Sequence, residues 1–238
     1  MTTTVKLALA NFEVYRLFTR ELKEGVNFYQ QLMNKVGSLI KRCQALHAYP
    51  LLRLYQMNEE ITQTLQHFYD EIDKFEGVLE KKKHLAGKQF YYKPVHFLEA
   101  PFDNALASNL VELVEVYDKL ISTLKTLRTA GCFSNDDDYF NNLRRYFKTV
   151  NRLLSQLLLS SMKDLPPITL DEVFKQAQSY KAHATLHGQL DWSQLYKALT
   201  SHVAPRLEEK TRRPLLALLN QRLQQNPLQP LNRAQEKE

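Results

Sequence analysis

The chain has 238 residues, a formal net charge of +6 and 44% hydrophobic residues, which is enough to bury a sizeable core. Its 6 Gly and 9 Pro are few, so long amphipathic runs predict a mainly α-helical protein. The two cysteines exclude a disulfide framework and predict a reducing compartment, and the longest apolar run is too short to span a bilayer. Because the first residues lack a signal-peptide pattern, we expect a cytoplasmic protein with no membrane partner.

The first third of the chain carries apolar residues at helical spacing. Residues 5–46 form one such run, which Gly25 and Gly37 bend or interrupt. A second run follows Pro50 and continues to about residue 80. We therefore predict a long N-terminal helical hairpin over residues 1–83.

Residues 90–98 are the one stretch that looks like a β-strand, because aromatic and β-branched residues are concentrated there. Alternation predicts that Val95 and Phe97 pack on the helices. Tyr92, Pro94, His96 and Leu98 would then face the other way. A lone strand leaves its backbone groups unpaired, so we expect it to pair with the same strand of a second copy.

Two helices are predicted after the strand, over residues 104–129 and 136–162. Asp103 or Asn104 can cap the first, Gly131 stands at its C′ position, and Ser134 or Asn135 can cap the second. Strand, helix, short turn and helix follow in the order of a ribbon-helix-helix unit. We assign residues 84–165 to this strand-helix-helix core.

The remainder is predicted to be a C-terminal helical extension over residues 166–225 and a disordered tail over residues 226–238. Thr169 and Glu172 form a capping box, a further helix runs over residues 192–203, and Pro214 should kink or break the last helix.

The strand and the lysine-rich stretch before it are the predicted DNA-binding site. Tyr92 and His96 are candidates for base edges, and Lys93 and Lys88 for phosphates. The basic stretch adds Lys81, Lys82 and Lys83, although lysines also suit a solvated helix end. No glycine-rich phosphate loop, HExxH motif, CxxC pair or G-x-S-x-G elbow is present, and the histidines lack metal-ligand spacing. We therefore predict a protein that is not an enzyme and has no metal, cofactor or small-molecule substrate.

Arg42 and His47 form the one pattern that points to an enzyme. Their spacing resembles the R-x4-H signature of HEPN-type helical ribonucleases, although Cys43 stands where that family usually has a polar residue. This resemblance implies an RNA-cleaving activity as the third functional interpretation.

Three segments together resemble the AcaB-like proteins of conjugative plasmids and integrating conjugative elements: residues 48–54 (AYPLLRL), residues 94–102 (PVHFLEAPF), and the helix that carries Tyr117 and Asp118. The resemblance covers about residues 48–158. It implies a bacterial, dimeric ribbon-helix-helix transcription regulator that binds duplex DNA at promoters of transfer genes. Asp136, Asp137 and Asp138 depart from it, because carboxylates at that helix start would repel a phosphate.

The leading functional hypothesis is therefore a homodimeric regulator of conjugative transfer that binds duplex DNA through a β-ribbon and basic flanks. The alternative is a helical scaffold or accessory protein of a transfer or secretion system, in which the same basic surface meets an acidic partner. A basic stripe along the second core helix, which includes Arg144, Lys148 and Arg152, fits either alternative or a solvated face.

Overall fold

The computed structural model describes residues 3–23, 25–82, 91–162, 165, 167–175 and 192–225. The chain divides into two compact units, one made of residues 1–39 and 56–164 and the other of residues 40–55 and 165–238. Two helices, α2 and α3, contribute to both units. As predicted, the described chain is mainly helical. None of its described helices is long and apolar enough to cross a membrane.

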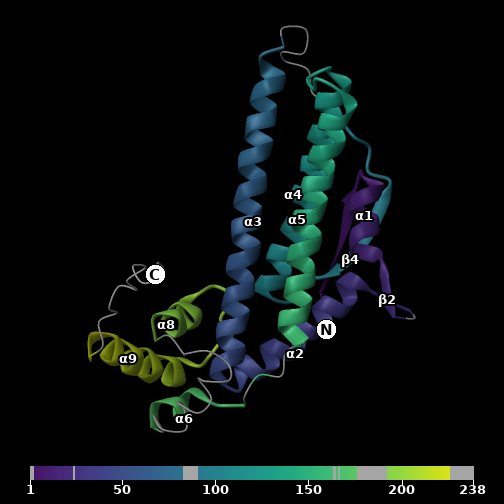
Figure 1. Cartoon of the computed structure of the whole chain (residues 1–238). Helices are drawn as coiled ribbons and strands as arrows, with labels where there is room; N and C mark the ends of the chain where they lie inside the picture. Colours follow the sequence, from purple (N-terminus) through teal and green to yellow (C-terminus); the bar gives the residue numbers. More distant parts are fainter. Residues whose placement is uncertain are drawn as a thin grey trace, which may run out of the picture. The chain divides into compact units, whose positions relative to one another are not determined.

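The first unit contains the small strands and the long helices (Figure 1). Its elements are β1 (Thr4–Leu9), α1 (Phe12–Thr19), β2 (Glu21–Lys23), β3 (Val26–Asn27), most of α2 (Phe28–Gln44), most of α3 (Ala48–Glu80), β4 (His96–Pro101), α4 (Ala105–Thr129) and α5 (Asp136–Met162).

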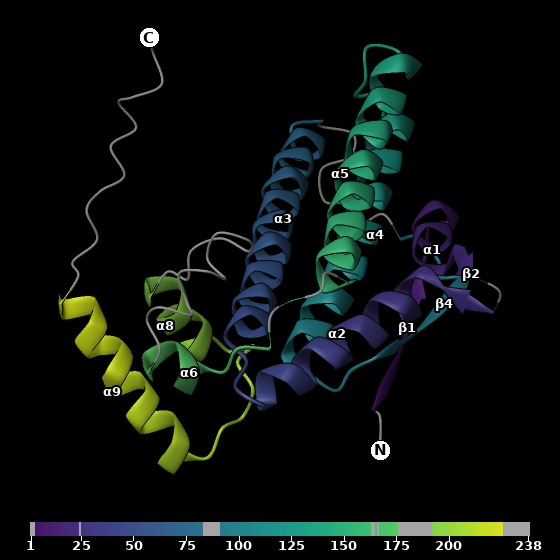
Figure 2. The same cartoon turned by 60° about the horizontal axis from the view of Figure 1, so that its bottom comes forward.

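Helix α4 is the centre of this unit, because it is buried on most of its circumference. The long helices α3, α4 and α5 lie side by side in Figures 1 and 2. Phe68 of α3 stacks on Tyr117 of α4 at a centroid distance of 5.9 Å and meets Tyr146 of α5 edge-on at 6.0 Å. All three side chains are at most 1% exposed, so they join the helices in one core.

Strand β4 pairs with β1 of the same chain in an antiparallel, two-stranded sheet, with Leu98 opposite Leu7. The prediction of a lone strand that needs a second copy for its hydrogen bonds is therefore wrong. Its bounds also shift, since residues 91–95 are outside the strand and the pairing continues to Pro101. The predicted order of strand, helix, turn and helix is present in β4, α4 and α5.

The two faces of β4 are the reverse of the prediction. Leu98 and Ala100 are buried against the helices, whereas Val95 and Phe97 are 57% and 52% exposed. The physical reason is that Leu7 and Leu9 of β1 supply the apolar partners on the buried side. Because successive side chains of a strand point to opposite faces, an error of one residue in choosing the buried position exchanges the buried and exposed faces of β4.

The predicted N-terminal hairpin of two long helices is also wrong in its first half. Residues 4–9 form β1, α1 is short, and β2 and β3 form a small antiparallel hairpin before α2 begins. Val5, Leu7 and Leu9 alternate with shorter or polar residues, which is the period of a strand. Gly25, with a φ of +72°, lies between β2 and β3, whereas Gly37 lies within α2 without interrupting it.

The predicted core helices and their ends are confirmed. The Asn104 side chain accepts a hydrogen bond from Ala107 N at 2.9 Å, and Asn135 caps α5 in the same way through Asp138 N. Gly131 has a φ of +63°, and its N–H donates to Arg128 O while Cys132 N donates to Leu127 O. These two bonds are the Schellman motif that ends α4.

The described residues of the second unit include the end of α2, the start of α3, α6 (Leu170–Lys175), α8 (Trp192–Thr200) and α9 (Glu209–Gln225). The predicted capping box is confirmed, because Thr169 N donates to Glu172 Oε2 at 2.8 Å and Glu172 N donates to Thr169 Oγ1 at 3.3 Å. Helix α9 continues past Pro214 to Gln225 rather than breaking there. The disordered tail predicted over residues 226–238 lies outside the described residues.

Candidate nucleic-acid interface

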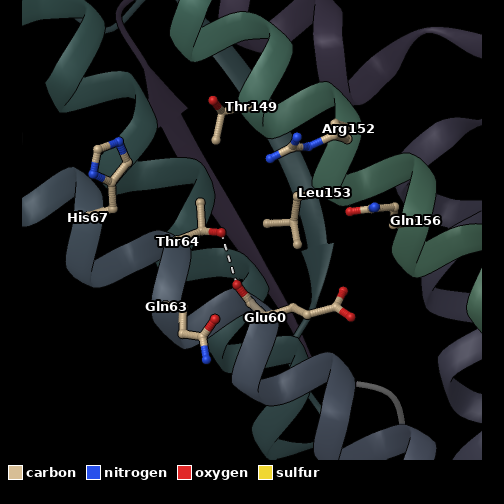
Figure 3. Close-up of a pocket in the computed structure, with 8 residues that line it drawn as sticks. All are labelled: Glu60, Gln63, Thr64, His67, Thr149, Arg152, Leu153 and Gln156. Carbon is tan, nitrogen blue, oxygen red and sulfur yellow. Dashed lines mark hydrogen bonds between the residues drawn. The ribbon is translucent and has the colours of Figure 1, made fainter. Parts of the chain in front are cut away.

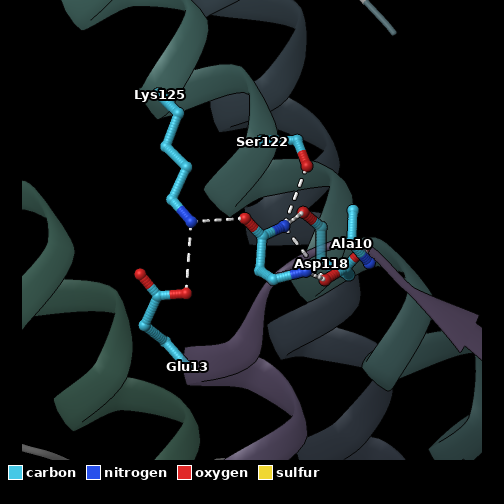
Figure 4. A network of polar contacts seen from close by, with 6 residues as sticks. Ala10, Glu13, Asp118, Ser122 and Lys125 are labelled. Carbon is cyan, nitrogen blue, oxygen red and sulfur yellow. Dashed lines mark hydrogen bonds and ion pairs between the residues drawn. The ribbon is translucent and has the colours of Figure 1, made fainter. Parts of the chain in front are cut away.

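The junction between β1 and α1 is held by a buried carboxylate on α4 (Figure 4). Asp118 accepts hydrogen bonds from the backbone N–H groups of Ala10 and Asn11, each at 3.0 Å. The Asn11 side-chain amide donates to Asp118 and, at 2.8 Å, to Ser122 Oγ. Because Asn11 and Asp118 are 1% and 8% exposed, these bonds fix the start of α1 with little competition from water.

Lys125 completes this network at its solvent side. Its Nζ donates to Asn11 Oδ1 at 2.7 Å and forms an ion pair with Glu13 at 3.1 Å. The ion pair balances the acidic residue in the first turn of α1. The network therefore orients α1 and offsets the negative charge of Glu13 beside the groove described next.

A groove of about 470 Å³ lies between α1 and α5. Its lining includes Phe12 and Arg16 of α1 and Phe147 of α5. Phe12 is 54% exposed and Phe147 is 42% exposed, so both aromatic rings can be reached by a ligand. Leu17, which is buried, forms part of the apolar lining.

Arg20, at the end of this groove, is held in place by two neighbours. Its guanidinium lies 4.4 Å from the centre of the Phe28 ring, and its Nη1 donates to Asn151 Oδ1 at 2.8 Å. Burial of the guanidinium lowers the pKa of Arg20 from its ordinary value. Its position is set before any ligand binds, so little side-chain entropy is lost on binding.

Further cations extend the groove along α5. Phe140, Arg144 and Phe147 are spaced four and three residues apart, so they lie on one stripe of the helix, and Lys148 is next to Phe147. Within the described part of the chain, the side chains of Arg16, Arg144 and Lys148 form no ion pair or hydrogen bond. We call this surface the α1–α5 face; it comprises Phe12, Arg16, Arg20, Phe140, Arg144, Phe147 and Lys148.

A second, more polar pocket of about 220 Å³ lies between α3 and α5 (Figure 3). Glu60 and His67 of α3 line one side, and Arg152 of α5 lines the other, with Leu153 between the helices. Glu60 Oε2 is buried without a hydrogen-bond partner. Opposite charges and a small volume make this pocket a weaker candidate for a polyanion than the α1–α5 face.

Two of the side chains predicted to contact DNA from the strand region, Tyr92 and His96, contact the helices. The Tyr92 hydroxyl accepts a hydrogen bond from Thr126 Oγ1 of α4 at 3.1 Å. His96 is half-buried and stacks on Tyr15 of α1 at a centroid distance of 5.3 Å. Lys93 is exposed. Packing therefore engages two of these side chains and leaves Lys93 open to solvent.

The predicted lysines before the strand are only partly described. Lys81 and Lys82 directly follow α3, whereas Lys83 and Lys88 lie outside the described residues. Figure 1 shows the end of α3 near the turn between α4 and α5, whereas β4 lies farther along the bundle. Lys81 and Lys82 are therefore not gathered with His96.

The residues of the predicted ribonuclease motif have structural partners in the second unit. Arg42 Nη2 donates to the Leu165 carbonyl oxygen, and His47 forms an isolated antiparallel bridge with Thr169. These contacts connect the α2–α3 turn to the segment before α6. Leu46, in the same turn, has a φ of +60°, an unusual conformation for leucine.

The sequence did contain a signal for the α1–α5 face. Phe12, Arg16 and Arg20 are four residues apart, which places them on one side of a helix. The sequence also predicts a basic stripe on α5, which includes Arg144 and Lys148. Only the fold shows that α1 and α5 come together and leave both phenylalanines exposed.

Comparisons with protein-family models, with curated proteins and with solved structures found no match. Among the described residues, no group of three or more His, Cys, Asp or Glu side chains is placed to hold a metal ion.

Proposed function

We propose that the protein binds nucleic acid and that the α1–α5 face is its contact surface. The observation that carries the proposal is the alternation of cations and exposed aromatic rings around the groove. Arg16, Arg144 and Lys148 are available for phosphates, and Phe12 and Phe147 for bases. The net charge of +6 adds long-range attraction for a polyanion.

The chemistry of these side chains supports a phosphate-bearing ligand. Guanidinium groups bind phosphates through two parallel hydrogen bonds, and their positive charge displaces counterions from the nucleic acid. Glu13 is the one acidic side chain among the described residues that line the groove, and it is paired with Lys125. A ligand phosphate would therefore meet cations that have no competing carboxylate.

A role in the regulation of conjugative transfer, as a homodimer on duplex DNA, is the second candidate. It is favoured by the antiparallel β1–β4 ribbon, a shape that the DNA major groove can admit. Lys6 lies on its exposed face, 4.5 Å above the Phe97 ring. Among the described strands, no third strand covers either outer edge of this sheet, so a second copy could pair there.

Binding of fluorescently labelled DNA, measured by anisotropy over a series of salt concentrations, tests the proposal. Two double variants remove the same charge: Arg16→Ala with Lys148→Ala on the α1–α5 face, and Lys41→Ala with Arg213→Ala in the second unit. Each of these four cations is exposed. The first variant should lower the slope of log affinity against log salt by about 1.5 to 2. The second should bind nearly as tightly as wild type.

Two results would contradict the proposal. Equal weakening by both double variants would show that only total charge matters. No binding at low salt would favour the scaffold interpretation, in which the same arginines and aromatic rings meet an acidic protein, since these residue types are also enriched in protein interfaces.

A further inference from the structure

We infer that the α1–α5 groove takes an unpaired base, so that the preferred ligand is single-stranded rather than duplex nucleic acid. This inference rests on the proposed function and specifies its ligand. It follows from the shape and lining of the groove, which cations alone do not explain.

The first step is the position of the aromatic rings. Phe12 and Phe147 come from different helices and both line the groove, whose volume of about 470 Å³ lies in the range of about 300–1,000 Å³ typical of small-ligand clefts. A flat aromatic base that enters the groove can stack on a phenylalanine ring. Such stacking tolerates any base sequence, because every base has a π-face.

The second step is the distribution of charge around these rings. Arg16 lies one helical turn from Phe12, and Arg144 lies nearly one turn from Phe147. Backbone phosphates on either side of a stacked base could therefore meet cations. Arg20 is already oriented by Phe28 and Asn151, which makes the groove partly preorganised.

Duplex DNA would use this groove poorly. Its bases are stacked on one another, so it presents phosphates and base edges to a protein surface but no free base faces. The two exposed phenylalanines would then remain in water or face the charged backbone. In a single strand the bases can turn outward and bury those rings.

The experiment compares wild type with Phe12→Leu and Phe147→Leu, which keep an apolar side chain of similar size but remove the π-face. Phe102→Leu is the matched control, because Phe102 is a similarly exposed phenylalanine that follows β4 and is not part of the α1–α5 face. The probes are a single-stranded DNA, an RNA of the same sequence, the matching DNA duplex, and a DNA strand of equal length whose bases are replaced by abasic spacers.

We expect wild type to bind single strands more tightly than the duplex. Each groove variant should bind single-stranded DNA on the order of tenfold more weakly, with an unchanged salt slope. The abasic strand should bind weakly to wild type, and its affinity for the Phe12→Leu and Phe147→Leu variants should be the same as for wild type. Comparing the single-stranded DNA with the RNA of the same sequence shows whether the 2′-hydroxyl contributes to the affinity.

The outcomes separate this inference from the proposed function. If Arg16→Ala with Lys148→Ala weakens binding but the phenylalanine variants and the abasic strand bind as well as their controls, the groove does not take a base and only the inference fails. A preference for duplex would also overturn it. Failure of every probe to bind would overturn the proposed function itself.

Discussion

The buried Asp118 carboxylate provides a quantitative test of how α1 is held. Replacement by alanine removes the acceptor of two backbone N–H groups, those of Ala10 and Asn11. A buried donor that loses its partner costs about 1–3 kcal/mol. Asn11 is fully buried and Ala10 is half-buried, so water can reach the second N–H more easily. We therefore expect Asp118→Ala to lower the free energy of unfolding by about 3 kcal/mol.

Urea denaturation followed by circular dichroism measures this change. Asp118→Asn keeps one acceptor oxygen but turns the other into a donor, so it should fall between wild type and Asp118→Ala. Glu115→Ala, an exposed position on the same helix, should change the free energy of unfolding by no more than about 0.5 kcal/mol.

The same variant links stability to the proposed site. Because Asp118 fixes the start of α1, Asp118→Ala should also weaken nucleic-acid binding, even though its carboxylate is buried and cannot touch the ligand. A loss of less than about 1 kcal/mol in Asp118→Ala would refute the reasoning, since the two N–H groups would then have found other partners.

Three further predictions concern the core, the ribbon and the pH dependence. Phe68→Ala should lower the free energy of unfolding by about 3–5 kcal/mol, because the ring is fully buried against two tyrosines; unchanged thermal unfolding would contradict this. Val95→Pro should lower the free energy of unfolding by about 1–3 kcal/mol, because Val95 N donates to Leu9 O at 3.0 Å. Phe97→Ala, on the exposed face, should lower it by about 0.5–1 kcal/mol, because it loses only the contact with Lys6. Equal losses of the two variants in urea denaturation would argue against the β1–β4 pairing. Burial raises the pKa of Glu71, but the hydrogen bond from Tyr146 and the charges of Lys74 and Arg145 outweigh it and hold the pKa below its ordinary value. Its stabilising effect is therefore complete above the ordinary pKa of 4.5 and is lost as pH falls through the lowered value, so Glu71→Gln should show a weaker loss of stability between neutral and acidic pH than wild type.

The sequence predicted the ends of the helices correctly where they depend on contacts between residues close together in the chain. The caps of α4 and α5, the glycine after α4 and the Thr169–Glu172 box use hydrogen bonds that span only a few residues. Such bonds are fixed by residue type and spacing, and all of them are present. The same holds for the bounds of α4 and α5, whose apolar spacing is sustained over many turns.

Pairing over long distances could not be predicted in this way. The strand at residues 4–9 alternates correctly, but a short alternating segment also fits a helical stripe. Only its pairing with residues 96–101 decides between the two. That partner also decides which face of β4 is buried. The lone-strand prediction failed because the second strand lies at the other end of a long helical insertion.

The candidate site shows the same limit. Amino-acid order placed arginines and phenylalanines at helical spacing on α1 and α5, which determined that each helix has a mixed cationic and aromatic stripe. Only the tertiary structure decided that the α1 stripe and Phe147 of α5 line one groove, because Asp118 orients α1 and Asn151 of α5 holds Arg20. Helical periodicity is a local property of the chain, whereas the distance between two helices depends on everything packed around them.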